Sequence, residues 1–230
     1  MSKLPYLVAE INAAIEVYLS GRTGQQYNRT AFILCDDCAE LASKLFLLTD
    51  TAAWSDTKAN NQFKRFKEVT AEVRAVFHAK RLVDHTAVNT LLAKIEARRD
   101  RRNGFFHSTN LLDLTLHAHD CVEAFCDLLD YGKLLFPASP AAIGSGWDTA
   151  VEATGNMETC ETILRLDRKA YGDPSVSPKI NAILKKTQRL QGERPSKRGC
   201  EVVHHPEDYH LRLCIRNGGK ALRDKLRTVL

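Results

Sequence analysis

Residues 4–19 have the sequence LPYLVAEINAAIEVYL, and this stretch decides the fold class. Its apolar side chains recur at spacings of three and four: Leu4, Leu7, Val8, Ile11, Ile15, Tyr18 and Leu19. That spacing places them along one side of an α-helix, whereas a half-buried strand would alternate at every second residue. The stretch therefore predicts an amphipathic helix that buries one face.

The same helical periodicity returns in four more segments before residue 137, which are 28–49, 61–79, 86–102 and 110–136. No convincing alternating strand lies among them, and the links between them are short. Several amphipathic helices with short links are typical of a helical bundle. We therefore predict an all-α fold, a bundle of four to five helices.

The stretch PASPAAIGSG, residues 137–146, is the best linker candidate in the chain because Pro, Ala, Ser and Gly dominate it. We therefore expect a bundle over 1–136, a linker over 137–146 and a mainly helical C-terminal extension over 147–230. Within the extension we expect helices at 157–171 and 178–191. A short strand at 199–204 and a helical tail from 206, broken at Gly218 and Gly219, complete the prediction.

The composition is that of an ordinary globular chain: of 230 residues, 44% are apolar and 27% are charged. No apolar run approaches the roughly 18 residues that a membrane helix needs. The first residues mix charged and apolar side chains too early for a secretory signal. We expect a cytoplasmic protein with no membrane partner.

The net charge of +5 is unevenly distributed. Residues 1–136 contain 17 basic and 17 acidic side chains, whereas residues 137–230 contain 16 and 11. The basic surplus lies in two stretches, 179–200 and 209–230. Such stretches suit a polyanionic partner through counterion release, and a solvated basic helix face is the equally acceptable alternative.

The seven cysteines cannot all pair within one chain, and without a secretory signal they are expected to be reduced. Cys35 and Cys38 form a C-x-x-C inside a helical segment, without the second pair of ligands that a zinc site needs. We interpret them as a core or helix-surface pair, and Cys121 and Cys126 likewise. A cluster of histidines near Cys200 and Cys214 matches no standard zinc finger, so we expect no metal and no cofactor.

The segment ARRDRRNGFFH, residues 97–107, carries most of the chemistry. If the helix continues through Gly104, a rotation of ~100° per residue places Arg99, Arg102, Asn103 and His107 within an arc of ~140°. A stripe of this kind is expected to face a cleft or solvent, while Phe105 and Phe106 anchor the turn elsewhere.

These side-chain types suit the cleavage of an RNA phosphodiester without a metal. Histidine moves protons near neutral pH, arginine binds phosphate bidentately, and asparagine positions either group by hydrogen bonding. The ribose 2′-hydroxyl would attack the phosphorus and leave a 2′,3′-cyclic phosphate. Since each chain offers one histidine here, two copies across a two-fold axis would complete the site.

Arg102, Asn103 and His107 in RNGFFH resemble the R-x4-6-H signature of the HEPN superfamily, with the usual polar residue after the arginine. Residues 31–44 resemble the earlier acidic helix of that family, and the resemblance covers about 28–136. It implies a HEPN-like bundle and a metal-independent endoribonuclease that works as a homodimer. Arg102 and His107 would be catalytic, and Asn103 would orient them.

Many HEPN proteins are toxins of toxin–antitoxin pairs or antiviral, phage-defence effectors, so RNA and an antitoxin or regulatory protein are the expected partners. Others only bind, and a non-catalytic HEPN-like module is the alternative for this chain. Arg98, Arg99 and Arg101 are candidates for binding the RNA backbone, or else they are solvated. Asp36, Asp37 and Glu40 are interpreted as a solvated helix face, with a role near the site as the alternative.

Overall fold

A computed structural model describes residues 3–20, 25–80, 85–107, 116–137 and 146–173, together with 175, 178–179, 182, 223–224 and 226–228. The side chains of Gln25, Gln26, Phe106 and His107 are outside this description. The described residues form the helices α1 (Leu4–Ser20), α2 (Gln25–Asp50), α3 (Phe66–Ala79), α4 (His85–His107), α5 (Ala118–Leu135), α6 (Trp147–Ala153) and α7 (Met157–Gly172). They contain no β-strand, only one isolated bridge between Thr57 and Phe63. The predicted all-α fold is confirmed.

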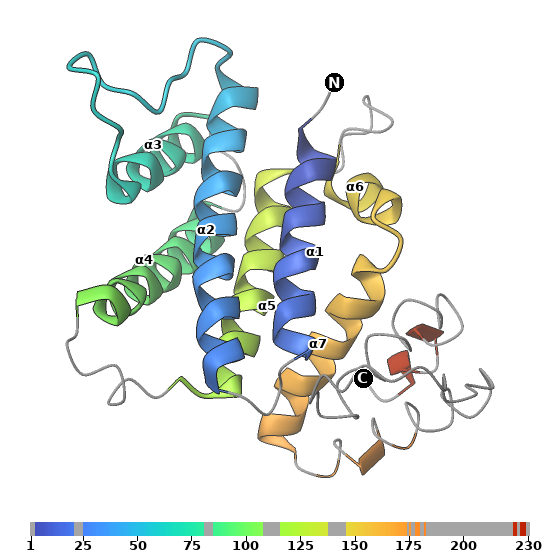
Figure 1. Ribbon diagram of the computed structural model, residues 1–230. Coiled ribbons are helices and arrows are strands. Elements are labelled where there is room, and N and C mark those ends of the chain that lie inside the picture. The colour runs from blue at the N-terminus through green and yellow to red at the C-terminus, as the bar shows by residue number, and fades with distance from the viewer. Residues whose placement is uncertain are drawn as a thin grey trace, which may run out of the picture.

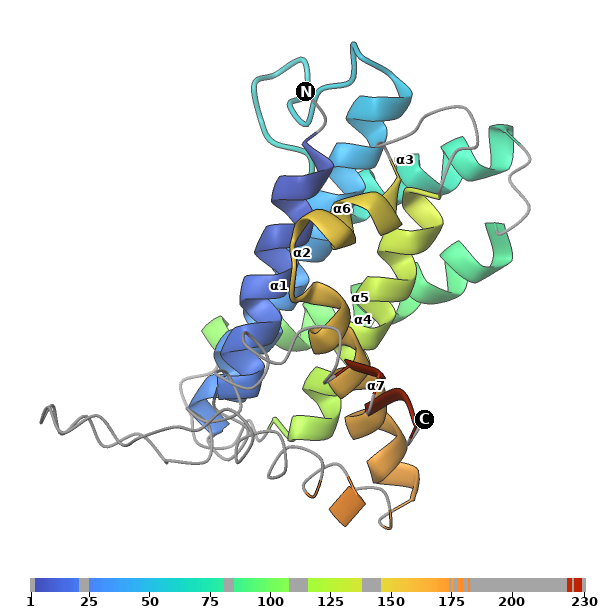
Figure 2. The same ribbon diagram turned by 90° about the vertical axis from the view of Figure 1, so that its right-hand side faces the viewer.

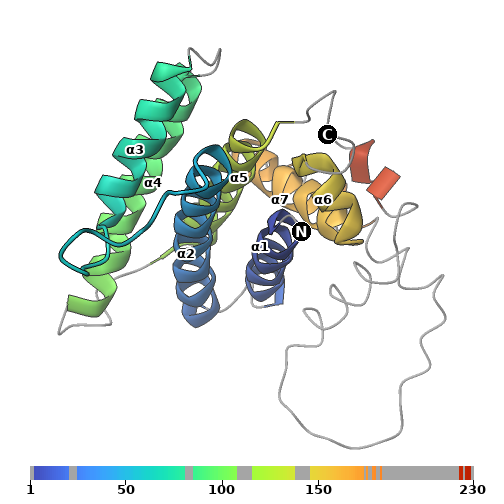
Figure 3. The ribbon, with the colours of Figure 1, turned by 90° about the horizontal axis from the view of Figure 1, so that it is seen from above.

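The helices form three groups, and the middle group consists of α2 and α5 (Figures 1 and 3). The α3 and α4 helices pair with each other on one side of α2. The α1, α6 and α7 helices lie on the other side, and α1 packs most extensively against α2. Figure 2 shows α6 and α7 beside α1 and α5, and both of these helices contact α6 and α7. The end of α4 that carries the arginines therefore lies in one of the two outer groups.

The core follows from the apolar periodicity. In α1 the predicted stripe is buried along its whole length, from Leu4 to Leu19. In the central α5 almost every residue from Cys121 to Leu129 is buried, because helices cover it on several sides. One of these buried residues, Asp127, is charged, and it takes part in the site described below.

The start of α3 was predicted at residue 61, and this was wrong. A loop continues to Arg65, because Asn61 takes a left-handed φ of 59° and the backbone N–H groups of Lys58 and Lys64 bond to carbonyls within the loop. The helix begins at Phe66, where the Glu68 carboxylate accepts a hydrogen bond from the Arg65 backbone N–H at 2.7 Å.

The start of α5 was also predicted too early. Leu116 and His117 are not helical, and Asp120 accepts the His117 backbone N–H at 3.0 Å to begin the helix at Ala118. Residues 108–115 lie outside the described part of the chain.

The expected boundary at 137–146 does not divide the hydrophobic core. Trp147 begins α6, a helix that was not predicted, and its indole is buried against α5. The predicted helix at 157–171 is confirmed as α7. The core cluster includes α1, α5 and α7 residues alike. The predicted strand at 199–204, the linker residues 138–145, and nearly all of the helices expected at 178–191 and after 206 lie outside the described residues.

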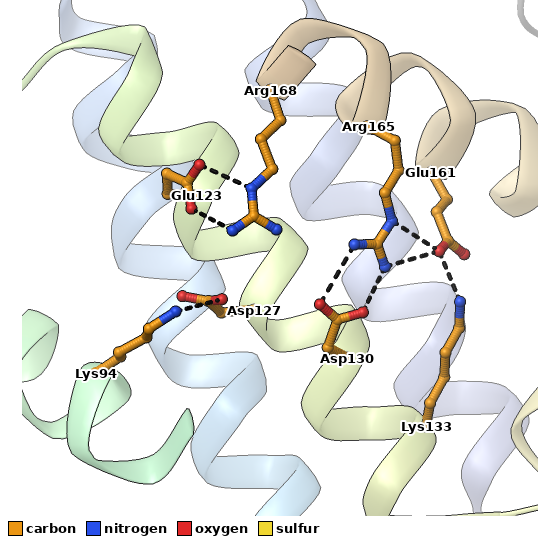
Figure 4. A network of polar contacts seen from close by, with 8 residues as sticks. All are labelled: Lys94, Glu123, Asp127, Asp130, Lys133, Glu161, Arg165 and Arg168. Atoms are coloured by element: carbon orange, nitrogen blue, oxygen red, sulfur yellow. Dashed lines mark hydrogen bonds and ion pairs between the residues drawn. The ribbon is translucent and has the colours of Figure 1, made fainter. Parts of the chain in front are cut away.

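A ladder of ion pairs joins α7 to α5 (Figure 4). Arg165 bonds Asp130 at 2.6 Å and Glu161 at 3.1 Å, and Arg168 reaches Glu123 at 2.8 Å. Lys133 completes the ladder with a 2.7 Å contact to Glu161. These pairs are partly exposed, so they fix the register of the two helices while the buried apolar side chains supply most of the stability.

Gly132 marks a close approach of α5 and α6, because a Cβ there would lie 2.3 Å from the Trp147 ring. Trp147 is 1% exposed, so its indole ring is enclosed by the core. We expect Gly132→Ala to lower the free energy of unfolding by about 1–3 kcal/mol. Urea denaturation measures this loss.

Gly104→Ala is the matched control, because a Cβ at this helical position would meet no atom within 4 Å. It should raise the free energy of unfolding by about 0.5–1 kcal/mol through helix propensity. Equal effects of the two substitutions would contradict the close approach at Gly132.

Candidate functional site

The α4 helix continues through Gly104 and ends at His107. The backbone positions of Arg102, Asn103 and His107 therefore follow one another around the last two turns of one helix, as the sequence predicted. The side chain of His107, expected to be catalytic, lies outside the described part of the chain.

Arg102 faces the acidic side of α2. Its Nη2 lies 2.8 Å from Asp37 Oδ1, and its Nε lies 3.4 Å from Asp36 Oδ2. The Arg102 side chain keeps 20% of its surface exposed, and that of Asp37 keeps 47%. The guanidinium is thus held at the edge of the bundle by two carboxylates.

Arg99 lies about one turn earlier and shares one of these carboxylates, Asp36. Its Nη2 is 2.6 Å from Glu40 Oε2 and 3.4 Å from Asp36 Oδ2, and its guanidinium lies over the Phe66 ring at 4.3 Å. Glu40 in turn receives Lys44 at 2.9 Å. A continuous network of charges therefore joins α2 and α4.

This network corrects the interpretation of Asp36 and Glu40 as part of a solvated face, whereas Asp37 remains about half exposed. Asp36 is buried and Glu40 is half-buried, because α4 packs on this side of α2. The expected cationic stripe is corrected too, since Arg99 and Arg102 face carboxylates of the protein rather than an open cleft.

Arg98 and Arg101 point to α5. Arg98 pairs with Asp127, whose carboxylate is almost fully buried. Lys94 forms a second ion pair with Asp127 at 3.3 Å, which is drawn in Figure 4. Arg101 pairs with Asp120 at 3.0 Å nearer the surface. All three arginines predicted to bind RNA therefore have carboxylate partners within the protein.

Asn103 and Phe105 complete the end of α4. Asn103 Oδ1 accepts a hydrogen bond from Arg102 Nη1 at 3.3 Å, which fits an orienting role for this amide. Phe105 is buried against Phe32 and anchors the turn, as predicted. Arg29, which sequence reasoning missed, donates from Nη2 to the Phe105 carbonyl at 2.6 Å and ties the start of α2 to the end of α4.

Burial dominates the electrostatics of Asp36. Desolvation raises the pKa of its carboxyl to about 6, although the Arg99 and Arg102 guanidiniums act in the opposite direction. Desolvation also acts on Glu40, but hydrogen bonds from Lys44 and Arg99 outweigh it and lower the Glu40 pKa. The pKa values of Asp36 and Glu40, which lie one turn apart, are thus shifted in opposite directions, because only Glu40 accepts close hydrogen bonds.

Cys35 and Cys38 are buried free thiols, in agreement with their interpretation as core residues. Burial raises the pKa of Cys38 to about 12, so this thiol stays protonated and unreactive. Within the described residues no group of three or more His, Cys, Asp or Glu side chains is arranged to hold a metal ion. The histidines near Cys200 and Cys214 lie outside the described ranges.

Comparison with protein-family models, with curated proteins and with solved structures finds no match to this chain. None of the helices in the described ranges has the length and apolarity needed to cross a bilayer.

The raised pKa of Asp36 predicts a pH-dependent stability. Between about pH 4 and pH 6 the folded protein keeps a proton on Asp36 that the unfolded chain has released. The free energy of unfolding therefore decreases, through this carboxyl, as the pH rises from about 4 to about 6. Asp36→Asn should abolish this contribution, which is on the order of 3 kcal/mol.

The measurement is urea unfolding of the wild type and Asp36→Asn from pH 3.5 to pH 8. The stability of the variant relative to the wild type should increase up to about pH 6–7 and then level off. Parallel profiles of the two proteins would contradict a buried, proton-binding Asp36.

We expect a large loss of stability when one charge of the Arg98–Asp127 pair is removed. Asp127→Asn leaves the Arg98 guanidinium partly buried without its carboxylate, which should cost about 3 kcal/mol of unfolding free energy. Asp100→Asn is the control, because Asp100 pairs with Lys67 on the exposed surface at 3.6 Å and should cost less than about 1 kcal/mol. Equal losses in thermal or urea unfolding would rule out a structural role for the buried pair.

Proposed function

We propose that the protein is a metal-independent endoribonuclease, in keeping with its resemblance to the HEPN superfamily. The observation that carries the proposal is the fixed position of Arg102, five residues before His107 on the same helix. Asp37 and Asp36 hold its guanidinium from α2, and one-fifth of the side chain remains exposed. A guanidinium held in advance at a surface loses little freedom when it binds a phosphate.

The proposed reaction uses one histidine from each of two copies. The imidazole of one His107 takes the proton from the ribose 2′-hydroxyl, and the oxygen attacks the adjacent phosphorus. The bond from phosphorus to the 5′-oxygen breaks, and the second His107, in its protonated form, donates a proton to that leaving oxygen. The products are a 2′,3′-cyclic phosphate and a 5′-hydroxyl, and Arg102 offsets the negative charge that develops on the phosphoryl oxygens.

Asn103 has a positioning role in this proposal, because its amide oxygen accepts a hydrogen bond from the Arg102 guanidinium.

Arg98, Arg99 and Arg101 contribute less directly. Their carboxylate partners hold them in place and offset their charge, so they support the position of the α4 end rather than wrap an RNA backbone. The basic stretches at 179–200 and 209–230 are better suited to that backbone, because there basic residues outnumber acidic ones. A role as a toxin or phage-defence effector, controlled by an antitoxin or regulatory protein, fits this activity.

A non-catalytic helical module is the second candidate. It is favoured by the ion pairs of Arg98, Arg99, Arg101 and Arg102 with carboxylates of the same chain, since such pairs also serve a purely structural role. In that case RNA or a protein partner would bind without being changed.

The test is incubation of the purified full chain with total RNA in EDTA. We expect fragments that end in a 2′,3′-cyclic phosphate, identified by mass spectrometry of the 3′ ends. His107→Ala and Arg102→Ala should each lower the cleavage rate by at least about 100-fold. His85→Ala is the matched control, because this exposed histidine lies at the opposite end of the same helix, and it should cleave like the wild type.

Expression in a bacterial host is a second readout. The nuclease predicts growth arrest that His107→Ala relieves. Intact RNA at high protein concentration, or cleavage unaffected by His107→Ala, would overturn the nuclease proposal. RNA binding by the wild type without any cleavage, unchanged in His107→Ala, would support the non-catalytic module.

A further inference from the structure

The outer side of α1 and α2 carries an apolar groove, here called the α1–α2 groove. Figure 1 shows the two helices side by side with α5 behind them. The groove is lined by Lys3, Tyr6, Leu7, Glu10, Leu41, Lys44, Leu45, Leu48, Trp54, Ser55 and Asp56. Tyr6 is 72% exposed, and Leu41 and Leu48 are 46% and 38% exposed. Side chains of this size rarely gather on a surface that has no partner.

The spacing of the exposed residues on α2 is that of a helix-packing seam. Tyr27, Leu34, Leu41 and Leu48 follow one another every seven residues, and Leu45 lies between the last two. Each of them is exposed or half-buried, whereas the neighbouring Ala42 and Phe46 are in the core. A seven-residue apolar repeat on the solvent side of a helix is typical of packing against another helix.

The groove carries both positive and negative side chains, so the charges of one copy can match those of a second copy. Lys44 and Asp56 pair with each other at 3.3 Å. Lys3 and Glu10 are exposed, and neither forms an ion pair with any residue in the described part of the chain. They lie seven positions apart, so both lie within about 60° of Tyr6 around the α1 axis and are separated along it by about 10 Å. Their midpoint falls beside Tyr6 and Leu7.

We propose that the α1–α2 groove binds a second copy of this chain, with the two α1 helices antiparallel across a two-fold axis beside Tyr6. An antiparallel pairing about that midpoint brings Lys3 of each copy opposite Glu10 of the other. The two-fold axis thus gives each of these two charged side chains an oppositely charged partner on the other copy. Each Tyr6 becomes a central anchor that packs into the partner's leucines, as aromatic residues do at the centre of interfaces.

This contact is independent of the nuclease proposal. It includes no residue of α4, whereas the proposed catalytic pairing brings two α4 ends together. A chain that uses both contacts forms an assembly larger than a dimer. Loss of the α1 contact therefore reduces the size of the assembly without removing Arg102 or His107, and the two proposals fail separately.

The first experiment is a charge exchange, followed by analytical ultracentrifugation of the full chain. Lys3→Glu and Glu10→Lys should each weaken self-association at least about tenfold, because each places like charges opposite each other twice. The double variant Lys3→Glu/Glu10→Lys restores opposite charges and should associate like the wild type. An equimolar mixture of the two single variants should also associate, since one variant is acidic at both positions and the other is basic at both.

The second experiment is disulfide trapping in a Cys200→Ser/Cys214→Ser background, in which all five remaining cysteines are buried. Tyr6→Cys should form a covalent dimer under mild oxidation, because the two copies of this position meet at the axis. Ala13→Cys is the matched control. It is exposed on the same side of α1, but its symmetry mate would lie about 20 Å away along the helix.

The proposal is overturned if the wild type stays monomeric at 100 μM. A monomer would indicate that the groove binds a different protein. The proposal is also overturned if the two single charge variants associate as strongly as the wild type, or if their mixture fails to regain association. Equal trapping of Tyr6→Cys and Ala13→Cys excludes this two-fold axis.

Discussion

The neutralisation of the α4 arginines by carboxylates of α2 and α5 is the constraint on which the arrangement of this end of the bundle depends. Arg98 reaches Asp127, and Arg99 and Arg102 share Asp36, so that two buried carboxylates and three guanidiniums meet where the three helices join. Charges at such depth are tolerable only in pairs. The α4 helix therefore cannot rotate or slide on the bundle without leaving a buried charge exposed to an apolar environment, and the last two turns of α4 are held in a defined orientation.

The same pairing has two consequences for function. It orients Arg102 at the surface in advance, which in the proposed nuclease would favour binding of a phosphate. It also cancels most of the local positive charge, because residues 1–136 carry as many acidic as basic side chains. A polyanion that approached this surface would find partly exposed guanidiniums that carboxylates of the same chain already neutralise. In the proposed nuclease, Arg102 would bind one phosphate, and the wider attraction for a nucleic acid would come from the basic surplus after residue 178.

The sequence predicted the elements better than their contacts. The apolar periodicities of α1, α2 and α7 indicated helices at nearly the observed bounds, because each helix has a stripe facing one core. The start of α3 was wrong, since apolar Phe63 fits the helical period but takes part in a loop bridge instead. The helix α6 was missed because seven residues are too short for a period to show. Asp36 and Asp127 were misjudged or missed for a common reason: a carboxylate is usually exposed, and only the packing of α4 reveals the arginines that allow its burial.

The number of histidines sets the last constraint on a catalytic site here. Transfer of a phosphoryl group to a 2′-hydroxyl needs one group that accepts a proton and another that donates one. The end of α4 provides a single imidazole, and the nearest acids on α2 are already engaged with arginines. Burial brings the Asp36 pKa to about 6, which is suitable for proton transfer, but this carboxyl is nearly enclosed between α2 and α4. A ribose has no approach to it. In the proposed nuclease, the second proton-transferring group would be the His107 of a second copy.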